Sequence, residues 1–307
     1  MTRTSMLIVA LLLATGSGLN TPIADLYDGS VFGKLSPDPV RAQQPTFSTR
    51  VEVVRVDVLV TENGRSVSGL KPADFEVADN GVPQKVDLVD VERLPLDLVL
   101  AFDISASVAG TRLGQLRSAS EVLLGELKEG DRVALVTFNQ VVRLRSPLTA
   151  VREGVQAALE QLRADGSTAL YDGSYLALMA VEQTSGRRLQ IVFSDGLDSC
   201  SWLSAETVVE TARRSGWVAY AVSVAEAGKS PAFLRDLCDV TGGRLIEVES
   251  TWNLSSVFVD VLNEFRQRYI VTYSPRGVAK DGWHRLEVRV KGRKATVKAR
   301  PGYLAGS

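Results

Sequence analysis

An apolar segment that ends abruptly in oxygen-bearing side chains is the feature that most limits how this chain can fold. Residues 96–102 are apolar except for one aspartate, and Asp103, Ser105 and Ser107 follow them. A short apolar run bounded by a loop is typical of a central strand that is covered on both faces of a sheet. Helix capping would explain one of the three polar side chains but not all of them. Oxygen donors at alternate positions are ligands that Mg²⁺ prefers, so the pattern predicts a metal site at the end of a buried strand.

Two later segments are expected to complete this site. Residues 188–194 form a second apolar run, which ends in Asp195 and a glycine suited to a sharp turn. Between the two runs lies a turn-rich loop, 165–173, which carries Thr168 and opens a helix. Ligands of a doubly wound sheet bind at the carboxyl ends of its strands, where these segments would meet. The predicted metal ligands are therefore Asp103, Ser105, Ser107, Thr168 and Asp195.

The order of the predicted elements indicates an α/β domain over residues 95–265. Strand-like apolar runs alternate with helical patterns across this span. Such alternation is typical of a doubly wound, mostly parallel sheet. One connection is exceptional, because only two residues separate the strands expected at 132–138 and 141–147. A connection this short joins antiparallel neighbours, so we expect one antiparallel edge strand.

The segments on either side of this domain are predicted to consist of strands and turns. Residues 49–94 contain three or four strand-like runs, and residues 266–303 contain about three. Neither set is large enough to bury a core alone. We therefore expect the two flanks to form one β-sandwich, into which the α/β domain is inserted. Two small independent appendages are the alternative.

The N-terminus has the pattern of an export signal. A basic residue precedes an apolar stretch at 6–14, and small residues follow it, so residues 1–18 are predicted to be a secretory signal peptide. Residues 19–48, rich in proline, glycine and glutamine, are predicted to be a disordered linker. The apolar stretch is too short to cross a bilayer, so no transmembrane span is expected; a retained membrane anchor is the alternative. The protein is thus predicted to be secreted or periplasmic, in the cell envelope. A net charge of −1 argues against a nucleic-acid partner.

Together the polar motifs resemble the metal-ion-dependent adhesion site (MIDAS) of von Willebrand factor type A (vWA) domains. The resemblance rests on the Asp-x-Ser-x-Ser segment, the loop threonine and the Ser-Asp-Gly turn. It implies hydroxyl ligation by Ser105, Ser107 and Thr168, and carboxylate ligation, often through water, by Asp103 and Asp195. It also implies Mg²⁺ or Mn²⁺ as the metal, and an Asp or Glu of a partner protein as its sixth ligand. The expected function is adhesion or another protein–protein interaction, without catalysis.

The flanks extend the resemblance to bacterial exported proteins of the von Willebrand factor A-related family. Motifs at 68–75, 79–84 and 283–303 are similar to that family's pattern. This resemblance implies an architecture and an exported location, but no particular partner. The predicted organisation is signal peptide 1–18, linker 19–48, first part of the β-sandwich 49–94, vWA-type domain 95–265 and second part of the β-sandwich 266–303.

Two other functions stay open. In one, the protein is a scaffold, and the metal only stabilises the loops of its own domain. In the other, the site belongs to a metal-dependent, phosphatase-like enzyme. That chemistry requires a second carboxylate two residues after the first, where this chain has Ser105. A Ser–His–Asp hydrolase has no support, because the single histidine, His284, lies in a predicted strand of the C-terminal flank, as a surface or core residue.

Five further side chains each have two interpretations. Asp172 and Asp198 either support the metal ligands or cap a helix. Trp202 either forms an apolar rim beside the metal for partner binding or packs on the following helix. Cys200 and Cys238 either pair in a disulfide, as export would permit, or are two buried thiols.

Overall fold

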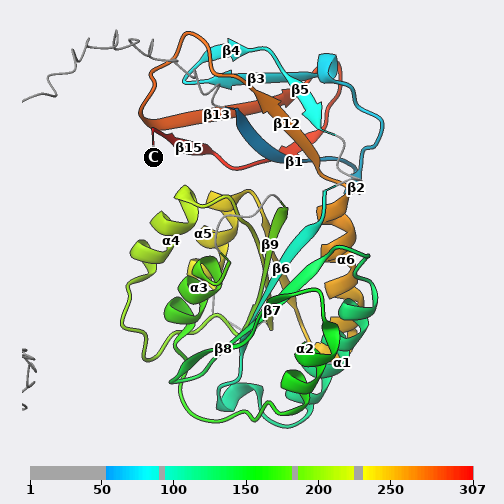
Figure 1. The fold of residues 1–307 in the computed structure, drawn as a ribbon, viewed down its shortest axis with the longest axis vertical. Coiled ribbons are helices and arrows are strands. Elements are labelled where there is room, and N and C mark those ends of the chain that lie inside the picture. Colours follow the sequence, from blue (N-terminus) through cyan, green and yellow to red (C-terminus); the bar gives the residue numbers. More distant parts are fainter. Residues whose placement is uncertain (1–52, 90–93, 182–185, 225–230, 307) are drawn as a thin grey trace, which may run out of the picture. The chain divides into compact units, whose positions relative to one another are not determined.

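A computed structural model describes most of the chain after the predicted linker (Figure 1). The predicted signal peptide, 1–18, and linker, 19–48, lie outside the described residues. Within the described part, no helix is long and apolar enough to cross a membrane. The described ranges are 53–89, 94–181, 186–224 and 231–306.

A six-stranded, mostly parallel sheet forms the centre of the α/β part, in the order β11-β10-β9-β6-β7-β8. The pairs from β11 to β7 are all parallel, whereas β8 runs antiparallel to β7. The predicted α/β class with one antiparallel edge strand is therefore confirmed for this sheet. The strands are β6 (Leu96–Asp103), β7 (Arg132–Phe138), β8 (Val142–Thr149), β9 (Arg187–Ser194), β10 (Val218–Val224) and β11 (Arg244–Val248).

Helices cover both faces of this sheet, which explains why β6 is buried at every position. Side chains alternate along a strand, so Leu98 and Leu100 face one core and Val99 and Ala101 face the other. Helices α1, α2 and α6 contribute to the first core, and α3, α4 and α5 to the second (Figure 1). They span α1 (Thr111–Gly125), α2 (Arg152–Glu160), α3 (Leu170–Met179), α4 (Ala205–Arg214), α5 (Ala232–Thr241) and α6 (Leu254–Arg266).

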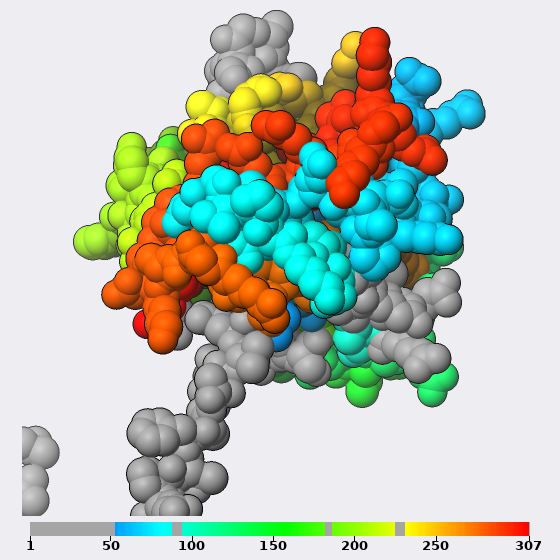
Figure 2. Space-filling view, turned by 90° about the horizontal axis from the view of Figure 1, so that it is seen from above, coloured from blue at the N-terminus to red at the C-terminus, as the bar shows by residue number. Residues whose placement is uncertain are grey.

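Strands from the two flanks of this domain pair with one another. Strand β1 (Val54–Glu62) pairs antiparallel with β12 (Tyr269–Tyr273), and β3 (Phe75–Asp79) with β13 (Gly282–Val290). Figure 2 shows the N-terminal segments in blue and cyan beside the C-terminal segments in orange and red. The other strands are β2 (Arg65–Ser66), β4 (Val82–Gln84), β5 (Asp87–Val89), β14 (Thr296–Lys298) and β15 (Gly302–Ala305).

These strands form two sheets, which we call the flanking sheets. One has the order β14-β1-β12-β5 with β2 beside β1, and the other has the order β15-β13-β3-β4. Alternate residues of β1, from Val54 to Val60, enter one hydrophobic core together with side chains of both sheets, including Phe75 and Leu286. The apolar residues that alternate along β1 in the sequence thus lie on the side of the strand that faces this shared core.

A buried polar group lies within the flanking sheets. Asp79 and His284 are both fully buried, and Oδ1 of Asp79 lies 2.7 Å from Nδ1 of His284. The hydroxyls of Tyr273 and Tyr303 each donate a hydrogen bond of 2.8 Å to Oδ2 of Asp79. Burial, followed by the hydrogen bond to this carboxylate, raises the pKa of Tyr273. His284 is therefore a core residue with polar partners.

Replacing Asp79 by alanine is expected to lower the free energy of unfolding by about 2–5 kcal/mol, because it leaves several buried polar groups without their acceptor. Urea unfolding, followed by fluorescence, measures this change. Glu76 lies on the same strand and is exposed, so Glu76→Ala is the matched control, with an expected change within about 0.5 kcal/mol. Equal stability of the two variants would refute a stabilising role for the group.

Candidate functional site

The Asp-x-Ser-x-Ser segment leaves the sheet at the carboxyl end of β6. Oδ1 of Asp103 accepts a hydrogen bond of 2.8 Å from the backbone N–H of Ser105. The Oγ atoms of Ser105 and Ser107 lie 3.1 Å apart. Asp103 and Ser105 are buried, whereas Ser107 is exposed. The side chain of Ser105 makes no capping hydrogen bond to the short helix η3 (Ala106–Val108) that follows it. Capping therefore does not account for this serine.

The end of β9 lies beside Asp103. Ser194, the last residue of β9, donates from Oγ to Oδ2 of Asp103 over 2.8 Å. The chain then turns at Gly196, whose φ of 84° belongs to the left-handed region that favours glycine. Asp195, at this turn, is half-buried, and its Oδ1 accepts a 3.0 Å hydrogen bond from the N–H of Leu197. Sequence reasoning identified Asp195 but missed Ser194, for which a polar residue at the end of an apolar strand is the available signal.

The loop that carries Thr168 is hydrogen-bonded to both of these segments. The N–H of Asp165 donates to the carbonyl oxygen of Ile104 over 3.0 Å, next to Asp103. The N–H of Thr168 donates to Oγ of Ser199 over 2.9 Å, and its carbonyl oxygen accepts from the N–H of Ser199 over 2.9 Å. Thr168 itself is buried. The structure thus brings the three predicted loops together at the carboxyl ends of β6 and β9.

The buried carboxylate of Asp103 has no positively charged side chain paired with it in the described part of the chain. Burial raises the pKa of Asp103 to about 6, and the nearby carboxylate of Asp195 adds to this increase. Within the described ranges, no lysine or arginine forms an ion pair with either aspartate. Those ranges also hold no cluster of three His, Cys, Asp or Glu side chains. Any metal here would thus need the serine and threonine hydroxyls as ligands, and an all-oxygen set fits a hard divalent cation.

Asp172 and Asp198 connect the loop after β9 to the start of α3. Oδ1 of Asp198 accepts hydrogen bonds from the N–H of Leu170 (2.8 Å) and from Oγ of Ser201 (2.5 Å). The carboxylate of Asp172 accepts from the backbone N–H groups of Trp202 and Leu203, each over 2.9 Å. Asp198 thus satisfies free N–H groups at the start of α3, as a capping residue does. Support of the metal ligands by these two residues stays a prediction.

Two tryptophans are exposed on loops of the α/β domain. Trp202, in the loop after β9, is 97% exposed, so the interpretation that it packs on the following helix is wrong. Its predicted role as a rim for partner binding is not tested by exposure alone. Trp252, in the short helix η4 (Thr251–Asn253) after β11, is 79% exposed and was not singled out from the sequence. Both side chains have apolar surface available for contacts.

The two cysteines correct a further expectation. Both are free thiols; Cys200 is exposed in the loop after β9, and Cys238 is buried in α5. The proposed disulfide is therefore absent, and the alternative of two buried thiols is also wrong. Burial raises the pKa of Cys238 to about 12, which keeps this thiol protonated and unreactive at neutral pH.

Comparison with known families identifies the α/β part. The family model of the von Willebrand factor type A domain matches residues 97–259, from β6 to α6. The chain belongs to this family. Its vWA domain therefore contains the complete central sheet and all of the residues proposed as metal ligands.

The chain is also similar to individual proteins and solved structures. The chain is 26% identical to the protein YfbK of Escherichia coli over 265 residues, covering 75% of this chain and 44% of that protein. The chain spans less than half the length of the curated relatives that it matches first. A von Willebrand factor type A structure from Catenulispora acidiphila superposes with a TM-score of 0.51 at 14% identity, over 84% of this chain and 75% of that one.

A further structural neighbour is proximal thread matrix protein 1 from the mussel byssus. Its structure, described with a zinc-occupied MIDAS motif, superposes with a TM-score of 0.51 at 19% identity. The superposition covers 60% of this chain and 49% of the mussel protein. At this identity the likeness establishes the fold that the two proteins share.

Proposed function

We propose that this vWA protein binds a partner protein through a divalent cation. The observation that carries the proposal is the buried carboxylate of Asp103, which accepts hydrogen bonds from the N–H of Ser105 and the hydroxyl of Ser194 but is paired with no cation in the described part of the chain. An unpaired buried charge is costly, and a metal ion would compensate it. The proposed ligands are Asp103, Ser105, Ser107, Thr168 and Asp195.

The composition of the ligand set supports recognition of an acidic side chain. Two carboxylates only balance the charge of a divalent cation, and neutral hydroxyls add none. A metal held in this way keeps its attraction for a further anionic oxygen, which a partner's Asp or Glu would supply. Oxygen-only coordination favours Mg²⁺ or Mn²⁺ for this chain, although the mussel relative is described with zinc.

The two alternatives receive less support. The side chain of Trp202, 97% exposed in a loop that is hydrogen-bonded to α3, supplies apolar surface that an external partner would contact and that a purely internal role for the metal would not use. A phosphatase-like enzyme would require a second carboxylate where Ser105 stands, and the Oγ of Ser105 lies against Ser107 instead. We therefore propose a non-catalytic interaction module.

We further propose that the flanking sheets are the predicted β-sandwich, split between residues 49–94 and 266–303, with the vWA domain of 95–265 inserted into it. Their pairing and common core support this division. The apolar N-terminal stretch supports a secreted or periplasmic location.

A pull-down from envelope extracts tests the proposed function. The full chain is expected to retain a partner in Mg²⁺, to release it in a chelator, and to recover it when Mg²⁺ is restored. Asp103→Ala should retain nothing above background in either buffer, because its metal site lacks a charged ligand. Retention that a chelator leaves unchanged would contradict metal-dependent recognition and favour the scaffold alternative.

A further inference from the structure

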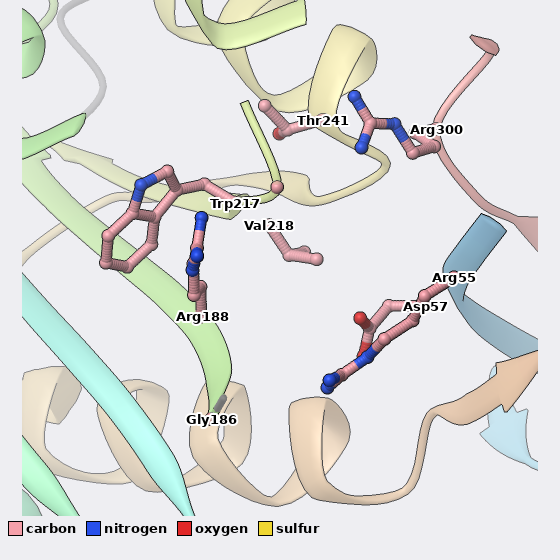
Figure 3. A pocket seen from close by; sticks show the side chains of 9 residues that line it. Arg55, Asp57, Gly186, Arg188, Trp217, Val218, Thr241 and Arg300 are labelled. Carbon is pink, nitrogen blue, oxygen red and sulfur yellow. The ribbon is translucent and has the colours of Figure 1, made fainter. Parts of the chain in front are cut away.

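A cavity of about 240 Å³ lies between the flanking sheets and the vWA domain (Figure 3). Its vWA side consists of the amino-terminal ends of β9 and β10, so it lies at the opposite end of β9 from Asp195. Its other side comes from β1 and from the segment between β14 and β15. The residues that line the cavity are Arg55, Asp57, Gly186, Arg188, Gly216, Trp217, Val218, Thr241 and Arg300.

Three arginines from three different segments border this cavity. Arg55 comes from β1, Arg188 from β9, and Arg300 from the segment after β14. Figure 3 shows their side chains extending from different sides around the same space. Like charges repel when they are brought together out of water. An arrangement of this kind is therefore stable only if the chain supplies carboxylates or if an anion enters from outside.

Among the described residues that line the cavity, Asp57 is the one carboxylate, and it is already hydrogen-bonded to another arginine. Oδ1 of Asp57 accepts hydrogen bonds from Nη2 (2.6 Å) and Nε (3.2 Å) of Arg187, outside the lining. Arg55 makes no hydrogen bond or ion pair with any other described residue. Burial is the main cause of its lowered pKa; the carboxylate of Asp57 opposes that decrease, and the neighbouring Arg187 and Arg188 add to it. Arg55 is thus a half-buried cation near one carboxylate and two further arginines.

The position of Arg300 is fixed by the backbone. Its Nη2 donates to the carbonyl oxygen of Arg213 over 2.6 Å, and its Nε donates to that of Gly302 over 2.8 Å. Burial also lowers the pKa of this group. Carbonyl oxygens orient a guanidinium but do not neutralise its charge. Arg300 is therefore held in place by neutral groups, and the carboxylate of Asp57 is the charged group that opposes the decrease in its pKa.

A glycine on the vWA side allows the close approach of one of these arginines. A Cβ atom at Gly216 would lie 3.3 Å from Nη1 of Arg188, closer than most such contacts. An alanine there would require the guanidinium to shift by a few tenths of an ångström. The lining thus combines open volume with a fixed cationic wall, which are the two requirements of a binding site for a small charged molecule.

We propose that this cavity binds a small oxyanion, the phosphate or carboxylate group of a small molecule, between the flanking sheets and the vWA domain. Guanidinium groups bind such anions through paired, charge-assisted hydrogen bonds. A cavity of about 240 Å³ is smaller than typical drug-sized sites, which suits a compact anion. Because its arginines come from both parts of the molecule, the bound anion would link them and stabilise their contact.

Calorimetric titration of the full chain tests this proposal. Inorganic phosphate and citrate are the probes, at constant ionic strength in chloride and with a chelator present so that no divalent metal mediates binding. Saturable binding of at least one probe is expected. At free anion about 100-fold above its Kd, the unfolding equilibrium constant should fall about 100-fold, seen as a higher Tm. Binding of phosphate alone would identify a phosphate site, and binding of both a general oxyanion site.

Variants of Arg55 separate a ligand site from a structural arginine. Arg55→Gln should weaken anion binding by at least about tenfold, and in chloride alone it should unfold at the same or a higher temperature, since it removes a cation without a partner. Arg55→Lys keeps the charge and should bind with intermediate affinity. Arg285→Gln is the matched control, because Arg285 is 76% exposed on β13, and it should bind as the unaltered chain does.

Two results would overturn the proposal. One is the absence of saturable binding of either anion to the unaltered chain. The other is an equal anion affinity of the Arg55→Gln and Arg285→Gln variants. That result would mean that the anion binds elsewhere or acts through general screening. Asp103→Ala should bind the anion normally, so that failure of this proposal and failure of the metal site are observed separately.

Discussion

Asp103→Ala is expected to lower the affinity for Mg²⁺ by more than about 100-fold. Even the loss of an indirect partner of a metal ligand lowers metal affinity about 10–100-fold, and Asp103 is proposed as one of only two charged ligands. The sheet should stay folded, because the substitution removes a buried carboxylate that no cation of the described chain compensates. Calorimetric titration with Mg²⁺ measures the affinity, and circular dichroism monitors the fold.

The same substitution should also remove the stabilisation that the metal provides. For the unaltered chain, Mg²⁺ at about 100-fold above its Kd is expected to add about 2.7 kcal/mol to the free energy of unfolding. Asp236→Ala is the matched control, since Asp236 is an exposed carboxylate on α5 and is not a proposed ligand. It should titrate as the unaltered chain does. An Mg²⁺ titration that Asp103→Ala leaves unchanged would exclude the proposed ligand set.

Arg187→Met is expected to lower the free energy of unfolding by about 3–5 kcal/mol, the usual loss when one partner of a buried ion pair is removed. Arg187 is buried; its Nη2 donates to Oδ1 of Asp57 over 2.6 Å and to the carbonyl oxygen of Phe265 over 2.9 Å. One side chain thus connects β9 to β1 of the flanking sheets and to the end of α6. Chemical unfolding in urea measures the loss.

A second substitution distinguishes the ion pair from simple packing. Asp57→Leu in the Arg187→Met background should restore part of the stability, because it removes the carboxylate that the first change leaves unpaired. Arg235→Met is the control, since Arg235 and Glu247 form an exposed pair, 49% and 42% accessible, for which a loss below about 1 kcal/mol is expected. Strictly additive effects of the two changes at Arg187 and Asp57 would argue against the pair.

Elements whose pattern is local could be predicted from the sequence. The apolar run of β6 follows from a core on each side of that strand, and the alternation in β1 from a core on one side. Similarly, the short connection before β8, three residues in the structure, decides that strand's direction. The end of β8 was predicted less accurately, since a strand expected to stop at Pro147 continues to Thr149. Proline is tolerated there because β8 is the edge strand.

Features that depend on register between distant segments could not be predicted. Ser194 reaches Asp103 because Phe102 lies opposite Phe193 across the pair β6 and β9, and no residue pattern within either strand encodes that alignment. The distance between the two cysteines could not be predicted for the same reason, because it depends on how α5 packs against the sheet. The proposed ligand set is a sequence-based prediction, since each member lies at the end of a recognisable strand or in a turn that follows one.

The pairing of β1 with β12 constrains the order of events during biosynthesis. Val54 lies opposite Tyr273, and ribosomes add about 5–20 residues per second, so the first strand waits roughly 10–40 s for its neighbour. The vWA domain between them is complete before that neighbour emerges. During that interval β1 lacks the neighbour that it has in the folded protein, and it presents an open edge that a chaperone, or another copy of the chain, can capture.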